Sequence, residues 1–495
     1  MVKNPYADIP ENMSQTEAAA DFVQSVKFAD LPEQVTRIGT RCILDGLGLL
    51  VAGSDERCVQ ILAEQVRMQG GRREALLLGW GKTKVPAALA ARVLGTAGHA
   101  HDWDDSQVSK DPKHVYGLLT HPTTAPLAAA LAASQLLGQI PGRDFLLAFL
   151  AGFEVECKIS EWMLPEHYMR GFHSTGTVGT LGAFAAVAKL MNLEANQIRN
   201  GFGMAASMAS GIRVNFGTMT KPLHVGRAAE NGVTAALLAA RGFTADQNAL
   251  DGPWGFFAVQ GGGVDTKKLD QGFGFPWSIV EPGVSIKPYP CGVLTHPSMD
   301  LMLKMVTEND IKPEQIESIT LFAGSNILNP IRYPIASNHL QAKFSLPAGL
   351  AMIILCRRAG KYEFSDSFVQ SLAMQDMQRK IKTIHDSEME KHGFDRMRSK
   401  ITIRLKDGRD IFGQTDKPYR GGPENPLTDD ELVDKVCSCC QGILDSSRQQ
   451  QLIECSWNIQ DLEDARTLAE YIQPEKKKTK KQDIHHARIR SPKAF

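Results

Sequence analysis

A helical pattern fills the first half of the chain, from Glu17 to about Gly242, and it sharply narrows the possible folds. Apolar residues recur there at i, i+3 and i+4 spacing, or surround the segment on all sides, as they do in buried helices. Helices are expected over Val35–Val51, Val85–Ala100, Ala125–Leu137, Phe145–Cys157, Val178–Met191 and Ala228–Ala240. We therefore expect a mainly α protein with a large all-helical domain over residues 1–282.

The pattern changes after Gly252, where glycines and prolines interrupt the chain. Two strands and two helices are expected beyond it: Ile316–Phe322, Lys400–Leu405, Pro297–Val306 and Leu340–Arg357. These elements predict a smaller α+β lid domain over residues 283–418. Residues 419–474 are helical again and are expected to return to the large domain. The basic tail over residues 475–495 is expected to be disordered.

Composition limits the class of protein. The chain has 495 residues, 43% hydrophobic and 22% charged, which is typical of soluble globular proteins with more than one domain. Its zero net charge predicts neither nucleic acid nor a membrane as partner. No apolar run reaches the ~18 residues of a membrane span, and the first residues resemble no signal or transit peptide. Nine cysteines, an odd number, predict reduced thiols, so we expect a cytoplasmic protein.

Histidines and acids are concentrated between Gly98 and Pro122, directly after an Ala-rich helix. This run holds His99, His101, Asp102, Asp104, Asp105 and His121. Buried carboxylates are costly unless they are paired, so acids at the end of a buried helix are candidates for a functional site. His-X-His and His-Asp pairs also occur in metal sites, but the rest of such a site is not evident in the sequence. We predict no metal.

Three later segments carry cations and histidines at expected helix starts or domain entries. His173 precedes a Ser/Thr/Gly-rich helix start, where free N–H groups favour an anion. Lys221 comes just before another helix start, with His224 close behind it, and Lys287 lies at the entry to the smaller domain. Together with the acidic run, these residues predict an acid–base site for a substrate that carries two or three carboxylates.

The order of these motifs resembles the MmgE/PrpD family. They are DGLG at Asp45–Gly48, then HAHDWDDS with THP, GFHSTGTVGTLG, TKPLHVGRAA, and KPYPCG with THP. The resemblance runs from about residue 15 to about residue 470. The family includes 2-methylcitrate dehydratase, cis-aconitate decarboxylase and iminodisuccinate epimerase. It implies a large helical domain with a smaller α+β lid, a homodimer with the site between the domains, and activity without metal or organic cofactor on small di- or tricarboxylates.

The resemblance also implies the roles of individual residues. The catalytic residues would be Asp102, His121, His173, Lys221 and Lys287. For substrate binding the resemblance implies Ser106, and we add His101, His224 and Cys291, which lie in the same motif segments. Asp104 and Asp105 would have supporting roles at the helix end.

Two positions depart from the decarboxylase branch of the family. That branch has a histidine shortly after the second lysine, where this chain has Cys291 and Gly292. It also has a tyrosine before a later A-X-X-S segment, where this chain offers Tyr333 at a shifted spacing. Both departures disfavour cis-aconitate decarboxylation.

The chemistry of such enzymes removes a proton next to a carboxylate, or loses CO₂ to the same kind of intermediate. Lys221, Lys287 and protonated histidine would stabilise the negative charge that develops. His121 or His173 would act as general base or acid, and Asp102 would orient one of them or carry the proton itself. We predict a cofactor-independent lyase that dehydrates a 2-methylcitrate-like or longer alkylcitrate. The alternatives are a dicarboxylate epimerase of the iminodisuccinate kind, a cis-aconitate-type decarboxylase, and a non-catalytic tricarboxylate-binding protein.

Overall fold

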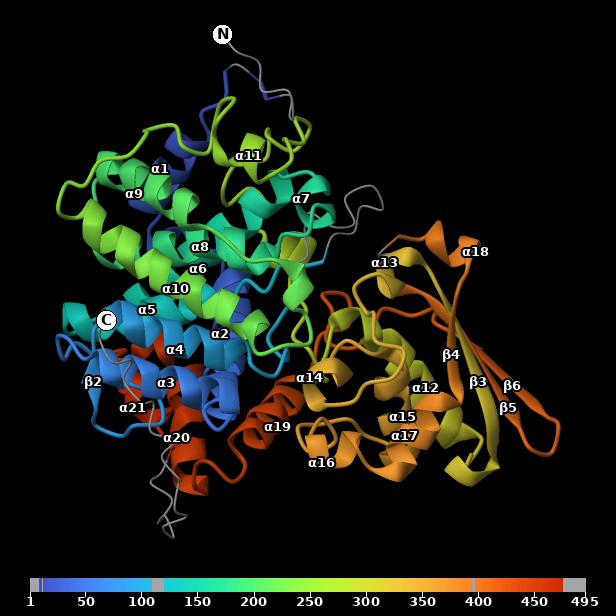
Figure 1. Ribbon diagram of the computed structural model, residues 1–495. Coiled ribbons are helices and arrows are strands. Elements are labelled where there is room, and N and C mark those ends of the chain that lie inside the picture. The colour runs from blue at the N-terminus through green and yellow to red at the C-terminus, as the bar shows by residue number, and fades with distance from the viewer. Residues whose placement is uncertain (1–8, 11, 109–119, 394–396, 475–495) are drawn as a thin grey trace, which may run out of the picture.

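The computed structural model describes residues 9–10, 12–108, 120–393 and 397–474, which form a larger and a smaller domain (Figure 1). The predicted basic tail over residues 475–495 lies outside the described residues. The larger domain is helical apart from one short hairpin, and the smaller one combines helices with a four-stranded sheet. The prediction of a mainly α fold with a smaller α+β domain is confirmed.

The first part of the larger domain holds eleven α-helices and two short strands among its described residues. They are α1 (Gln15–Ser25), α2 (Glu33–Gly53), α3 (Arg57–Gln69), β1 (Ala75–Leu76), β2 (Lys84–Val85), α4 (Ala87–His99), α5 (Thr124–Leu137), α6 (Gly142–Trp162), α7 (Glu166–Met169), α8 (Ser174–Leu190), α9 (Ala195–Met208), α10 (Thr220–Ala239) and α11 (Phe256–Val259). All six helices predicted from the apolar pattern are present.

Helix α8 lies at the centre of this domain, in contact with α5, α6, α9 and α10. Nearly every residue of α8 is buried, which explains why its sequence is apolar or small on all sides. Gly182 allows the close approach to α6, since a Cβ there would lie 2.8 Å from the carbonyl oxygen of Gly152. Small residues in this segment therefore serve helix packing.

The expectation of a wholly helical large domain missed the β1–β2 hairpin. Val85 was predicted to begin a helix, but it pairs with Ala75 in the hairpin, and α4 begins only at Ala87. Pro86 separates the two elements. Because proline favours an extended residue before it and fits the start of a helix after it, the boundary falls there.

The smaller domain packs its helices against one side of a mixed sheet. Its elements are α12 (His296–Glu308), β3 (Ile316–Ala323), α13 (Ser325–Leu328), α14 (His339–Ala342), α15 (Leu346–Cys356), α16 (Asp366–Val369), α17 (Leu372–Arg379), β4 (Ile381–His385), α18 (Ser387–Glu390), β5 (Ser399–Leu405) and β6 (Asp410–Gln414). The strand order is β4-β3-β5-β6, with β3 and β4 parallel and the other pairs antiparallel. In Figure 1 the strands lie on the side away from the larger domain.

Two details of the smaller domain differ from the sequence prediction. The single helix expected over Leu340–Arg357 is two helices, α14 and α15, because the Ser345 side chain caps the backbone N–H of Ala348 and starts a new helix. Strands β4 and β6 were not predicted. Four of the five residues of β4 are exposed, so this edge strand lacks a clear alternating pattern.

The chain returns to the larger domain through α19 (Asp429–Cys440), α20 (Ser446–Trp457) and α21 (Thr467–Tyr471). Helices α19 and α20 pack on α2, near the other end of the sequence. One apolar core accordingly combines residues from Ala19 to Ile286 with residues from Leu427 to Ile472, while a second core lies almost wholly between Tyr289 and Leu405. Among the described residues, no helix has both the length and the apolar character to cross a membrane.

The packing of α4, α8 and α10 brings three helix ends together. Helix α4 ends at His99, α8 begins at Ser174, and α10 begins at Thr220. Because α10 packs along both α4 and α8, the residues at these ends gather beside the smaller domain.

Candidate active site

A narrow pocket lies between the two domains. It is lined by Asp102, Ser106, His121, Tyr168, His173, Phe216, Lys221, Lys287, Gly292, Val293, Leu294, Pro330, Ile331 and Phe344. The five predicted catalytic residues and Ser106 are all among them. The structure therefore brings together groups that lie up to 185 residues apart in the sequence.

Asp102 lies between two lysines at the large-domain side of the pocket. Its carboxylate is 2.5 Å from Lys221 Nζ and 3.4 Å from Lys287 Nζ, and all three side chains are buried. Asp102 has a φ of 52°, a left-handed conformation that is uncommon for a non-glycine residue. This turn at the end of α4 directs the carboxylate toward both ammonium groups.

Burial and the neighbouring charges shift the pKa values of Asp102 and Lys221. Burial raises the pKa of Asp102, but Lys221 and Lys287 outweigh that effect and hold it well below its usual range. Burial lowers the pKa of Lys221, and the nearby carboxylate of Asp102 opposes that change. Asp102 is therefore ionised at any working pH, and Lys221 is a stronger acid than a surface lysine.

His121 presents one ring nitrogen to the pocket. Its Nδ1 donates to the backbone oxygen of Asp105 at 2.7 Å and lies 3.2 Å from Ser106 Oγ. Its Nε2 lies 4.0 Å from an Asp102 oxygen. Burial and the neighbouring Lys287 lower the pKa of His121 well below the ordinary value, so its ring is neutral and can accept a proton at Nε2.

His173 precedes the first residue of α8 and is also neutral. Burial and Lys221 lower its pKa well below the ordinary value. Its Nδ1 lies 3.0 Å from Nδ1 of His224, whereas its buried Nε2 has no hydrogen-bond partner among the described residues. His224 therefore contacts the site through His173 and does not line the pocket itself.

The opposite wall of the pocket is apolar. It is formed by Phe216 and by the smaller-domain residues Gly292, Val293, Leu294, Pro330, Ile331 and Phe344. A Cβ on Gly292 would lie 2.8 Å from Ile331 Cδ1, so the glycine leaves room for that isoleucine. The pocket thus has one charged side and one hydrocarbon side.

Besides His224, two more of the predicted substrate-binding residues, His101 and Cys291, do not line this pocket. His101 Nε2 contacts the carbonyl oxygen of Ala52 at 2.9 Å and lies 3.6 Å from Glu56, which also approaches His339 of the smaller domain. His101 therefore lies at the contact between the domains. Cys291 Sγ lies 3.1 Å from Thr295 Oγ1, and its side chain is part of the smaller domain's core.

Sequence reasoning missed the pairing of His99 with Asp104. His99 Nδ1 lies 2.7 Å from Asp104 Oδ2, and its Nε2 lies 2.5 Å from Lys221 Nζ. The sequence signal was the position of His99, the last residue of α4, just before the turn that carries Asp102. Tyr333, the tyrosine at shifted spacing relative to the decarboxylase branch, donates to the carbonyl oxygen of Phe216 and does not line the pocket.

The donor atoms of His99, Asp102 and Asp104, and those of His99, His121 and His173, lie close enough together for a metal ion. We do not assign them as metal ligands. The ammonium group of Lys221 already contacts His99, which is common to both sets, and an ion there would have to displace it.

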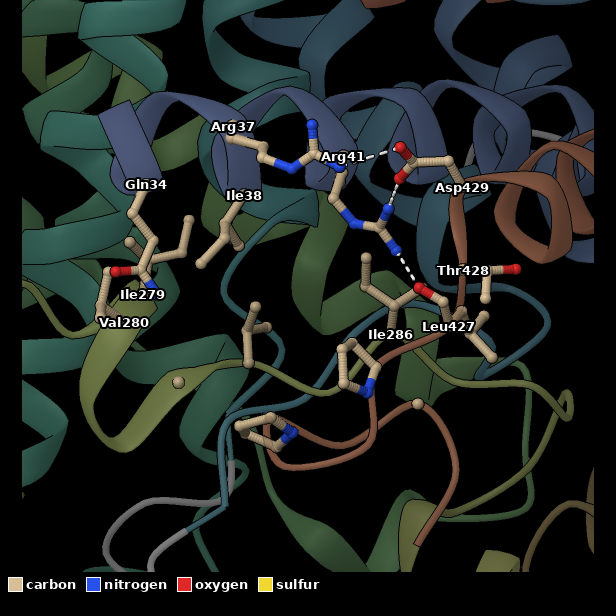
Figure 2. Close-up of a pocket in the computed structure, with 15 residues that line it drawn as sticks. Gln34, Arg37, Ile38, Arg41, Ile279, Val280, Ile286, Leu427, Thr428 and Asp429 are labelled. Atoms are coloured by element: carbon tan, nitrogen blue, oxygen red, sulfur yellow. Dashed lines mark hydrogen bonds and ion pairs between the residues drawn. The ribbon is translucent and has the colours of Figure 1, made fainter. Parts of the chain in front are cut away.

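A larger hollow of about 1040 Å³ lies elsewhere, between α2, the turn at Ile279–Gly283 and residues 421–429 (Figure 2). It contains none of the predicted site residues. Its two arginines are paired: Arg41 contacts Asp429 and the carbonyl oxygen of Leu427, and Arg37 lies 3.0 Å from Asp429. Its arginines and Asp429 are paired with one another and it holds no histidine or lysine among its described lining residues, so it is a weaker candidate than the pocket at Asp102.

Comparisons with known proteins identify the family of the chain. The MmgE/PrpD N-terminal domain model matches residues 17–268, and the MmgE/PrpD C-terminal domain model matches residues 289–461. Similar proteins include cis-aconitate decarboxylase of Mus musculus, 27% identical with 93% of each chain covered, and that of Homo sapiens, 26% identical with 92% of this chain and 94% of the relative covered. Cis-aconitate decarboxylase of Aspergillus terreus is 24% identical, with 94% of this chain and 97% of the relative covered. Because the two family models together match most of the sequence, in order, the chain belongs to the MmgE/PrpD family.

Proposed function

We propose that the chain is a cofactor-independent lyase that acts on a small tricarboxylic acid, and that it dehydrates a 2-methylcitrate-like or longer alkylcitrate. The observation that carries this proposal is the presence of two neutral histidines, His121 and His173, on the same pocket as two lysines. Neutral imidazoles accept protons, whereas buried ammonium groups bind carboxylates. A site with both is suited to proton removal next to a carboxylate.

In the proposed reaction, Lys221 and Lys287 bind the substrate's carboxylates from the Asp102 side of the pocket. His121 Nε2 removes the proton from the carbon next to one carboxylate, and negative charge develops on that carboxylate. The two ammonium groups stabilise this charge in a site that excludes bulk water. The C–O bond to the hydroxyl group then breaks, and the hydroxyl group leaves as water with a proton from Lys221.

The apolar wall supports a substrate with a hydrocarbon substituent. Citrate itself is polar over its whole surface, and its contact with Val293, Leu294 and Ile331 would leave those side chains facing oxygen atoms. Each methylene group that such a wall buries contributes about 0.8 kcal/mol. An alkylated citrate would place carboxylates on the lysines and its alkyl group on this wall.

Proton NMR in D₂O tests the proposal. The purified protein is mixed separately with citrate, 2-methylcitrate and the aconitate isomers. A vinyl or methyl signal of the dehydrated product supports the dehydratase. Deuterium exchange without loss of water or CO₂ indicates an epimerase instead. Binding in a thermal-shift assay without any turnover indicates the non-catalytic alternative, and both of these outcomes overturn the proposal.

Cis-aconitate decarboxylation is the second candidate, because the curated relatives carry that activity in their names. It requires loss of CO₂ and delivery of one proton. The same lysines would stabilise the intermediate, and His173 would deliver the proton. The same NMR assay separates the two candidates, since cis-aconitate would be converted to a product that lacks one carboxylate.

Three further expectations stay predictions: the homodimer, the cytoplasmic location and the independence from metal and organic cofactor. Sedimentation velocity tests the first. Activity measured after dialysis against a chelator tests the last, and full retention is the expected result.

A further inference from the structure

His99 links the acid Asp104 to Lys221, the lysine at the centre of the pocket. Asp104 oxygens lie 2.7 and 2.9 Å from His99 Nδ1, and Lys221 Nζ lies 2.5 Å from His99 Nε2. All three side chains are at most 3% exposed. Thr124 Oγ1 donates to Asp104 at 3.0 Å and holds the carboxylate in place.

This arrangement determines where His99 carries its proton. Asp104 is ionised, because the hydrogen bond from His99, the neighbouring His121 and the charge of Lys287 hold its pKa below the usual range against the effect of burial. A carboxylate accepts hydrogen bonds, so the proton of His99 lies on Nδ1. Burial lowers the pKa of His99, and the ring is therefore neutral. Its Nε2 then offers a lone pair to Lys221.

The lone pair on His99 limits the orientation of the Lys221 ammonium group. An ammonium group has three N–H bonds. One is directed at Asp102 Oδ1, 2.5 Å away, and a second at His99 Nε2. The third is left for the pocket, which Lys221 lines.

We propose that His99, oriented by Asp104, is a positioning residue that directs the third N–H bond of Lys221 at the substrate. His99 does not line the pocket, so it acts through Lys221. The proposal rests on the proposed function only in requiring that the pocket at Asp102 is the active site, whichever lyase reaction occurs there.

A purely structural role for His99 predicts different behaviour. A packing residue can be replaced by another side chain of similar volume at the expense of stability alone. A positioning residue that accepts a hydrogen bond also stabilises the charged form of the lysine, and its loss lowers the pKa of that lysine. The protonation of Lys221 therefore distinguishes the two roles.

The first test compares His99→Leu with His99→Gln in pH–rate profiles of the full-length protein. Leucine fills the space but accepts no hydrogen bond, whereas the glutamine carbonyl group can accept one. We expect His99→Leu to lower kcat about 100-fold, the scale of a misplaced catalytic group. Its alkaline limb should move to lower pH by about one unit, since a hydrogen bond to a charged group is of that size. In His99→Gln, kcat and the pH of the alkaline limb should both return most of the way to the wild-type values.

His167→Leu is the matched control. His167 is also a buried neutral histidine, but its ring contacts the carbonyl oxygen of Gln260 and the hydroxyl group of Thr177. We expect this variant to lose stability without a shift of the alkaline limb. Equal profiles for the wild type, His99→Leu and His99→Gln would overturn the proposal.

The second test does not need turnover, so it separates this proposal from the choice of reaction. The ¹³Cε signal of Lys221 is followed with pH in lysine-labelled protein and assigned by its loss in Lys221→Met. We expect the midpoint to fall in His99→Leu and to stay near the wild-type value in His99→Gln. A midpoint unchanged in His99→Leu contradicts the positioning role, even if no substrate has been found. If the midpoint of Lys221 shifts in His99→Leu but the protein dehydrates none of the acids, the positioning role of His99 stands. Only the proposed function is then overturned.

Discussion

Lys287 contacts Asp102 twice, donating to its backbone oxygen at 2.8 Å and lying 3.4 Å from its carboxylate. The lysine lies at the entry to the smaller domain, and the aspartate follows α4 of the larger one. The same ammonium group thus holds the left-handed turn that presents Asp102 and supplies positive charge to the pocket. Both the shape and the charge of the site therefore depend on the contact between Lys287 and Asp102.

Lys287→Met should therefore lower kcat/KM by about 10²–10³-fold, the loss found when one group that stabilises developing charge is removed. Lys435→Met is the control, because Lys435 is a buried lysine that pairs with Asp45 outside the pocket, at 2.6 Å. That variant should reduce the free energy of unfolding by about 3–5 kcal/mol, since it leaves a buried carboxylate unpaired. Steady-state kinetics and urea unfolding measure the two effects, and equal kinetic losses in both variants would contradict the assignment.

His121→Gln should lower kcat by about 10²–10⁴-fold with little change in KM, because a general base acts in the transition state. His173→Gln should also lower kcat, and both variants should keep the wild-type melting temperature within a few degrees. Turnover in the NMR assay and thermal melts provide the two measurements. Wild-type kcat in both variants would exclude these histidines from proton transfer.

Gly292→Ala should narrow the apolar side of the pocket. The added methyl group would contact the end of the Ile331 side chain, which must turn toward the substrate. We expect KM for an alkyl-bearing tricarboxylate to rise about tenfold relative to that for citrate, the scale of one misplaced methyl group in an apolar pocket. Competition assays with the two acids measure the ratio, and an equal change for both would place the alkyl group elsewhere.

Asp105 should make the folded protein more stable at acidic pH. Burial raises its pKa to about 7, although Thr123 hydrogen bonds oppose the change. The folded state therefore keeps a proton that the unfolded state loses near pH 4. The stabilisation from this group is complete below about pH 4 and is lost as the pH rises through about 7. Between pH 4 and 7, Asp105→Asn should show a smaller decrease of unfolding free energy with pH than the wild type, and an unchanged slope would argue against the shift.

Much of the fold was predictable because its helices are buried on nearly all sides. The apolar runs of α5 and α8 indicated helices that cannot be at the surface, and their bounds differ from the prediction by only a few residues. The edge strand β4 was not predictable in this way. Most of its side chains face solvent, and its pairing with β3 depends on backbone hydrogen bonds that any sequence can form.

The site was predictable where the sequence places charges at helix ends, and less so where direction matters. Asp102 follows the end of α4, His173 precedes α8, and Lys221 lies at the start of α10. Because these helix ends converge, the residue types and their positions were sufficient to predict this part of the site. His101 and His99 are two residues apart, yet one faces Glu56 and the other faces Lys221. Their directions depend on how α4 ends and turns, which the order of residue types does not determine.

The position of the last helices also has a consequence for biosynthesis. Helix α2 near the beginning of the chain packs on α19 and α20 near its end, and Asp45 has its lysine partner only there. In a nascent chain on the ribosome, the face of α2 that α19 and α20 cover lacks these partners throughout translation of the smaller domain. That domain, with its own core between Tyr289 and Leu405, can fold first. The core of the larger domain is completed only by the final segment, so loss of that segment by a premature stop would expose one face of α2 as well as shorten the chain.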